Sequence, residues 1–168
     1  FYSERRRNAM SVTIRAAEAG DVPALLRLVK ELAEYERLPH SVVATEASLA
    51  ATLFGERPEA EALIAEGEEG PVGLAVFFSN YSTFLGRSGI YLEDLYVRPE
   101  LRGQGIGKRL LAEVAKRAVE RGCQRLEWAV LDWNEPSIQF YKSLGAKPLD
   151  DWTTFRMTPE AIAKLAGM

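Results

Sequence analysis

Three glycines at alternate positions separate a β-branched and aromatic segment from a long amphipathic one, in the run YLEDLYVRPELRGQGIG from Tyr91 to Gly107. Glycine lets a backbone approach a ligand without a Cβ in the way. A helix start offers unpaired N–H groups and the positive end of the helix dipole. This strand–loop–helix junction therefore predicts an anion site suited to a phosphate or pyrophosphate. A turn whose glycines serve only chain geometry is the structural alternative.

The spacing of this junction excludes two familiar phosphate loops. A Walker A loop requires Gly-x4-Gly-Lys-Ser/Thr, but the residue five positions before Gly107 is Arg102, and Arg109 follows Lys108. A dinucleotide fingerprint G-x-G-x-x-G that starts at Gly103 would need a third glycine where Lys108 stands. A phosphate cradle at this loop would therefore be of a different kind from these two.

The hydrophobic periodicity predicts one domain of the α/β class (α+β by some schemes), a mixed sheet with helices on its faces, over residues 10–168. Phe1 to Ala9 is interpreted as a leader added for expression, with a basic arm as the alternative. Strands are expected at 12–15, 62–65, 72–78, 89–97, 126–130 and 153–157. Helices are expected after Asp21, after Thr45, from Ile106 to Gly122, from Asn134 to Leu144, and from Pro159.

The composition excludes several classes of protein. No run approaches the about 18 to 20 apolar residues of a membrane-spanning helix. One cysteine and one histidine exclude an intrachain disulfide and a His-rich metal cluster, and no metal is expected. The net charge of −3, or −5 without the three arginines and one glutamate of the leader, argues against nucleic acid as a partner. No secretory signal is visible, so a cytoplasmic location is expected.

Two motifs carry a resemblance to a known family. Arg102, Gly105 and Gly107 form R-x-x-G-x-G after a strand that ends LEDLYV, and Asn134 begins NEPSIQFYKSLGA. Together they resemble the GNAT superfamily of N-acetyltransferases, and LEDLYV with WNEPSIQFYKSLGA is closest to the spermidine/spermine (diamine) N-acetyltransferase family. The resemblance implies a mostly antiparallel sheet that is splayed at the coenzyme site, acetyl-CoA as co-substrate, and a homodimer.

The resemblance also implies a set of coenzyme contacts. The main chain of the strand end would pair with the pantetheine arm, and the glycine loop would hold the pyrophosphate. Tyr141 matches the general acid that reprotonates the leaving thiolate, which suits a phenol at neutral pH. An ordinary packed aromatic is the alternative for Tyr141. The implied coenzyme-binding residues are Leu95, Tyr96, Val97, Arg102, Gly103, Gln104, Gly105, Ile106, Gly107, Lys108, Asn134, Pro136, Ser137 and Tyr141.

On the acceptor side, Glu93 matches the acidic residue that contacts the amine and helps to remove its proton through water. A structural ion pair is the alternative. Because successive side chains on a strand face opposite sides, Asp94 is not expected to share this role. The other positions implied to line the acceptor site are Tyr35, Glu36, Glu127 and Trp128, for which a helix end or core packing is the alternative.

The chain departs from the polyamine-acetylating relatives in two places. Ser143 and Leu144 stand where two arginines are usual, so a basic coenzyme contact is expected from Lys142 or Arg109 instead. The segment from Leu149 to Phe155 is shorter, and Asp150 or Asp151 is the candidate for its acidic substrate contact. His40 and Cys123 are interpreted as an exposed loop residue and a buried small hydrophobe.

The sequence therefore predicts an enzyme that moves the acetyl group of acetyl-CoA to a primary amine of a small cationic acceptor, such as a polyamine or thialysine, by direct attack in a ternary complex. Acetylation of a protein lysine or N-terminus is the alternative within enzymes. A non-catalytic acyl-CoA-binding module is the alternative outside them, although it would need neither Glu93 nor Tyr141.

Overall fold

The structure, a computed structural model, describes residues 11–168. The expected leader therefore lies outside the described residues. The chain divides into two compact units, the first ending at Ala129 and the second spanning Val130–Met168.

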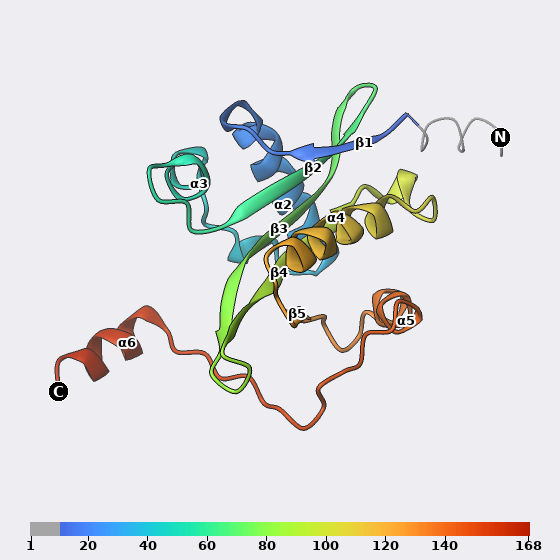
Figure 1. The fold of residues 1–168 in the computed structure, drawn as a ribbon. Helices are drawn as coiled ribbons and strands as arrows, with labels where there is room; N and C mark the ends of the chain where they lie inside the picture. Colours follow the sequence, from blue (N-terminus) through green and yellow to red (C-terminus); the bar gives the residue numbers. More distant parts are fainter. Residues whose placement is uncertain (1–10) are drawn as a thin grey trace. The chain divides into compact units, whose positions relative to one another are not determined.

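The first unit is built on one five-stranded sheet with the order β1-β2-β3-β4-β5 (Figure 1). Its strands are β1 (Thr13–Ala16), β2 (Glu61–Gly67), β3 (Gly70–Ser82), β4 (Arg87–Val97) and β5 (Leu126–Glu127). The first three pairings are antiparallel, and only β4 with β5 is parallel. This confirms the expected mixed, mostly antiparallel sheet.

Helices cover both faces of this sheet. Helices α2 (Val22–Tyr35) and α3 (Glu46–Phe54) pack with one core cluster, and α4 (Ile106–Glu120) packs with the other. Adjacent residues of β2 divide between the two cores, since Leu63 joins the α4 side and Ile64 the α2 side. This is the period-2 alternation of a strand that is buried on both faces. Short 3-10 turns lie at Ala19–Asp21, Pro39–Ser41 and Pro99–Leu101.

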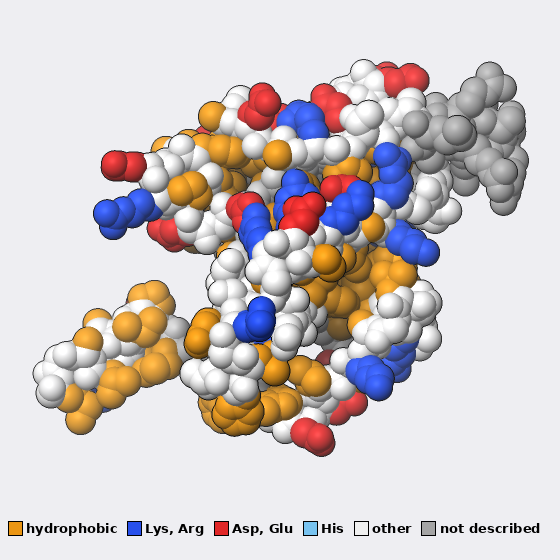
Figure 2. All heavy atoms as spheres, viewed as in Figure 1, with side chains coloured by type: hydrophobic (Ala, Val, Ile, Leu, Met, Phe, Trp, Pro, Cys, Tyr) orange, Lys and Arg blue, Asp and Glu red, His pale blue; other side chains and the backbone are white. Residues whose placement is uncertain are grey.

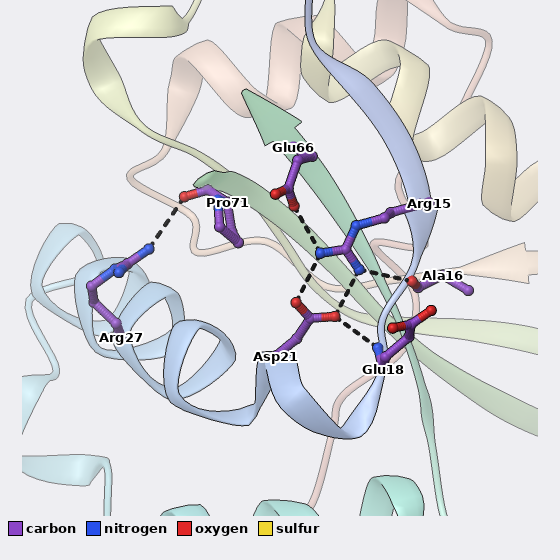
Figure 3. Close-up of polar contacts among 7 residues, drawn as sticks. All are labelled: Arg15, Ala16, Glu18, Asp21, Arg27, Glu66 and Pro71. Carbon is purple, nitrogen blue, oxygen red and sulfur yellow. Dashed lines mark hydrogen bonds and ion pairs between the residues drawn. The ribbon is translucent and has the colours of Figure 1, made fainter. Parts of the chain in front are cut away.

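An ion network ties β1, β2 and the start of α2 together (Figure 3). The guanidinium of Arg15 donates to both carboxylate oxygens of Asp21, at 2.7 and 2.8 Å, and to Glu66 at 2.7 Å. The hydrogen bond from Arg15 lowers the pKa of Asp21. Asp21 occupies the N-cap position as expected, but its carboxylate accepts from the Glu18 N–H and makes no side-chain cap bond to α2. Asp21 therefore holds the turn before α2 and does not cap the first turn of the helix with its side chain.

A β-bulge interrupts β4 at the position of greatest chemical interest. Val76 of β3 is opposite Asp94, whereas Phe77 is opposite Leu92, so Glu93 is the extra residue. A bulge bends its strand and breaks the strict alternation of side chains. The parallel pairing with β5 covers only Ile90 and Tyr91, directly before this bulge, and the strand expected at 126–130 is accordingly only two residues long. Beyond Tyr91, the two strands separate.

The second unit contains helices α5 (Glu135–Ser143) and α6 (Pro159–Ala166), both near their expected positions. The strand expected at 153–157 is wrong, because no strand forms there in the described chain. Its residues are exposed, and no ladder partner satisfies their backbone groups. A sequence of strand-forming residues does not make a strand without a neighbour to pair with. Figure 2 shows α6 with a largely apolar surface, where Ile162 and Leu165 are exposed.

Candidate active site

The glycine loop enters α4 through two left-handed residues. Gly103 has φ +75° and Gly105 has φ +82°, and a Cβ built on either would meet nothing within 4 Å. A side-chain-bearing residue is strained at such φ values. Gly105 is the N-cap of α4, and the buried side chain of Ile106 anchors the first turn in the core. The loop therefore presents uncovered backbone at the positive end of a 15-residue helix.

Two further residues of the loop fit a polar ligand. The side-chain oxygen of Gln104 is buried and has no hydrogen-bond partner among the described residues. A buried polar atom without a partner is costly, so it marks a place where a ligand or water is expected to bind. Lys108 is exposed in the first turn of α4. The loop therefore fits the phosphate-bearing part of a coenzyme.

The outer edge of β4 presents main-chain groups next to this loop. Arg98 N–H donates to Val72, so the main chain of Arg98 points toward β3. The oxygen of Tyr96 also points that way, since a Cβ on Gly73 of β3 would lie 2.8 Å from it. N–H and C=O of successive residues in a strand point to alternate edges. Leu95 and Val97 therefore direct their main-chain groups to the outer edge, and Tyr96 does not.

Arg102, at the start of the loop, contacts two aromatic rings and a carbonyl. Its Cζ lies 4.5 Å from the ring centroid of Tyr35 and 5.5 Å from that of Tyr96. Its Nε donates a 2.9 Å hydrogen bond to the Val97 oxygen. The structure thus brings one residue of the expected acceptor site, Tyr35, together with three of the expected coenzyme site.

Three carboxylates gather where α2 ends and β4 bulges. Burial raises the pKa of Asp94 to about 7, and the charges of Glu93 and Glu36 add to this. Burial, and then the charge of Glu93, also raises the pKa of Glu36, which is the C-cap residue of α2. Glu93 itself is exposed. The acidic group therefore contains two residues expected to contact the amine, Glu36 and Glu93, and one that is not expected there.

Asp94 is the residue that sequence reasoning missed. Asp94 was not expected to share the role of Glu93, because regular alternation puts successive side chains on opposite faces. The bulge at Glu93 removes that alternation, and the charge of Glu93 acts on Asp94. The packing of the neighbouring leucines shows the same break in alternation. Leu92 and Leu95 pack on the same core, although residues three apart in a regular strand face opposite sides.

Two other expected acceptor residues have structural roles. Glu127 of β5 makes a 2.7 Å ion pair with Arg125. Trp128 packs against the core cluster on the α4 side of the sheet. Core packing is the alternative weighed for Trp128, whereas the ion pair of Glu127 was not among the expectations.

The second motif lies in the second unit on α5. Asn134 is buried and caps the helix, where its Oδ1 accepts from the Ser137 N–H at 3.4 Å, and Pro136 stands in the first turn. Tyr141 is partly exposed in the last turn, its ring centroid 5.4 Å from that of Phe140. Asn134 and Tyr141 thus occupy the two ends of one short helix.

His40 is exposed in the turn Pro39–Ser41, as expected, and Cys123 packs against the core but is only partly buried. Asp150 and Asp151 are exposed in the second unit. None of the helices within residues 11–168 combines the length and hydropathy of a membrane span.

Comparison with known proteins agrees with this geometry. The model of the Acetyltransferase (GNAT) family matches residues 25–146. Thialysine N-epsilon-acetyltransferase of Bos taurus is 47% identical over 167 residues, which is 93% of this chain and 98% of that protein. Spermidine/spermine N(1)-acetyltransferase-like protein 1 of Homo sapiens is 37% identical over 91% of this chain and 23% of its own length.

A solved structure shows the same fold. The integron cassette protein VCH_CASS6 from the mobile metagenome of V.cholerae superimposes with a TM-score of 0.79 at 27% identity, over 94% of this chain and 99% of that one. The family match covers the glycine loop, the bulged strand and α5, the three features described above. The chain therefore belongs to the GNAT family and, with its close relatives among the diamine acetyltransferases, is an acetyltransferase enzyme.

Proposed function

We propose that this enzyme transfers the acetyl group of acetyl-CoA to the terminal amine of a small cationic acceptor, with thialysine as the first candidate. One observation carries the proposal. In a single unit, the outer edge of β4 leads into an open glycine cradle, and the same strand carries the carboxylates Glu93 and Asp94. An edge and a cradle suit an extended phosphorylated coenzyme, and carboxylates suit an ammonium group.

The coenzyme side of the proposal rests on backbone groups. The amides of Gly103 to Gly107 would hold the pyrophosphate, and Leu95 and Val97 would pair with the pantetheine arm by β-strand addition. Bound there, acetyl-CoA supplies an activated thioester carbonyl. An outward N–H of the strand end is suited to stabilise negative charge on that carbonyl oxygen.

The acceptor side rests on the acidic group. An amine attacks only in its neutral form, so its ammonium must lose a proton near the thioester. A pKa near 7 makes Asp94 an effective proton acceptor at neutral pH. We assign attraction of the cation to Glu36 and Glu93, and removal of the proton to Glu93 with Asp94, directly or through water.

Tyr141 is assigned the return of a proton to the leaving thiolate. The support is its place in the motif NEPSIQFYKSLGA and in a helix capped by Asn134, within the segment that the family model matches. A phenol is a suitable donor because it is protonated at neutral pH.

The identity of the acceptor follows from the relatives and from the charge of the site. The Bos taurus relative is named for thialysine, and the human relative for spermidine and spermine. Both kinds of acceptor are amines. Thialysine is favoured because the identity to its acetyltransferase is higher, 47% against 37%.

The test is a panel of amines assayed for CoA release with acetyl-CoA: thialysine, lysine, spermidine, putrescine, an aminoglycoside and a lysine peptide. We expect thialysine to give the highest kcat/KM. A higher value for the peptide or for an uncharged amine would overturn the acceptor assignment. CoA release with none of them would refute catalysis by this site. A homodimer in the cytoplasm completes the proposal, and light scattering and fractionation test it.

A further inference from the structure

Arg102 begins the motif R-x-x-G-x-G, yet its side chain is engaged within the first unit. The guanidinium lies 4.5 Å from the ring centroid of Tyr35 and 5.5 Å from that of Tyr96. A planar cation is attracted to the faces of such rings within about 6 Å. The Nε hydrogen bond of 2.9 Å to the Val97 oxygen fixes its direction. Ring and carbonyl contacts together set the orientation of this side chain.

The partners of Arg102 lie on opposite sides of the proposed reaction. Tyr35 is the last residue of α2 and directly precedes Glu36, one of the carboxylates of the acidic group. Val97 is the last residue of β4 and directs its main chain to the coenzyme-binding edge. Arg102 therefore links the acceptor end of one element to the coenzyme end of another.

A second arginine, Arg98, helps to hold the ring of Tyr96 on which Arg102 packs. Tyr96 donates its hydroxyl to Glu31 of α2 at 3.3 Å, and Arg98 donates to the same carboxylate at 2.8 and 3.2 Å. The hydrogen bonds from Arg98 lower the pKa of Glu31, so the carboxylate stays ionised. Glu31 and Tyr35 are four residues apart and share one face of α2. The Tyr96 ring is thus held by its hydroxyl while Arg102 packs on it.

From these contacts we infer that Arg102 is a positioning residue that sets the distance between the amine-binding carboxylates and the coenzyme-binding edge, and that it is not a phosphate ligand. The inference rests on the proposed function. Arg102 and Lys108 are both exposed, but the contacts of Arg102 direct it to Tyr35, Tyr96 and Val97, so phosphate binding is left to the loop amides and to Lys108 in the first turn of α4. Lysine at position 102 would keep the charge but lose the planar group that stacks and the Nε donor.

The test compares two donors, acetyl-CoA and S-acetylpantetheine, which lacks the nucleotide and its phosphates. We expect R102K to lower kcat/KM about 10-fold with both donors. A small misplacement of the reacting groups slows the reaction whether or not the donor carries phosphates. The ratio of kcat/KM with acetyl-CoA to kcat/KM with S-acetylpantetheine should stay at the wild-type value in R102K. The same ratio should fall in the control K108A. A fall confined to acetyl-CoA in R102K, or wild-type activity of R102K, would overturn the inference.

A second readout uses acetyl-CoA alone. We expect R102K to raise the KM for the amine as well as for acetyl-CoA, since the position of Glu36 depends on the same stack. Y35L removes the ring of Tyr35. In the Y35L background, R102K should lower kcat/KM by less than it does in the wild type. Unchanged amine KM, or full additivity, would contradict the link. If wild-type enzyme released no CoA with any amine, the proposed function would fail first, and Arg102 would not be the reason.

Discussion

Replacing Asp94 by asparagine tests the acidic group through the stability of the protein. Asparagine keeps the size of the side chain and removes its charge. The carboxyl is partly buried beside Glu93 and Glu36, and its pKa is about 7 against 3.8 for an unperturbed aspartate. The folded state therefore holds a proton that the unfolded chain releases, and the free energy of unfolding falls as pH rises through this range.

The magnitude follows from the two pKa values. Below pH 3.8 the carboxyl is protonated in both states and costs nothing. Above pH 7 the full difference applies, and each pH unit between them corresponds to about 1.4 kcal/mol. From pH 5 to pH 8.5 this amounts to about 3 kcal/mol. Because Asp94 keeps some solvent contact, which screens its charge, we expect the wild type to lose about 2 kcal/mol relative to D94N over that interval.

Urea unfolding of wild type and D94N at pH 5 and pH 8.5 measures the difference. Asp21 gives the control of opposite sign, because the hydrogen bond from Arg15 lowers its pKa. D21N should destabilise the protein by about the same amount at pH 5 and pH 8.5, because both lie above the pKa of the free carboxyl, and the difference should shrink only as pH falls below that pKa. A stability difference between wild type and D94N that does not change with pH would refute the reasoning. So would a D94N variant less stable than wild type at pH 8.5.

Three further substitutions test the proposed site. Gly107→Val places a branched side chain at a position with no positive φ and only Val97 nearby, so it should fold and weaken acetyl-CoA binding; unchanged affinity by calorimetry would contradict the cradle. Tyr141→Phe should lower single-turnover rates about 10²-fold or more with little change in coenzyme affinity, and a wild-type rate would exclude it as the proton donor. Glu93→Gln should raise the KM for the amine and lower kcat. The KM of the wild type for the amine should rise with salt, because a screened acidic site attracts cations less, and a KM independent of salt would count against attraction by charge.

Much of this fold was predictable because local signals and tertiary packing agree in it. Thr45 caps α3 through the Ser48 N–H, Asn134 caps α5, and Gly122 follows α4 with φ +68°, each as its residue type predicts. The glycine loop was predictable for the same reason. Two of its glycines, Gly103 and Gly105, have conformations that other residues adopt only with strain.

The failures have a common physical origin in pairing between strands. The segment 153–157 has the residues of a strand and no neighbour in the described chain, and β5 stops where β4 bulges. Neither partner choice nor a bulge is encoded in local periodicity. Asp94 was missed through the same bulge, since its burial depends on which way β4 turns after Leu92. The residue types of the candidate site could thus be identified in the sequence, whereas the way in which β4 arranges them could not be predicted.

The open edge of β4 also bears on self-association of the protein. A strand edge with unsatisfied N–H and C=O groups is a template on which another chain can add, and long flat edges promote aggregation. Here the edge is short, it is bent by a bulge, and Glu93 is exposed beside it. A second copy that approached edge to edge would bring carboxylates together. We therefore expect the charge of Glu93, proposed above to attract an amine, also to disfavour pairing of this edge with a second copy.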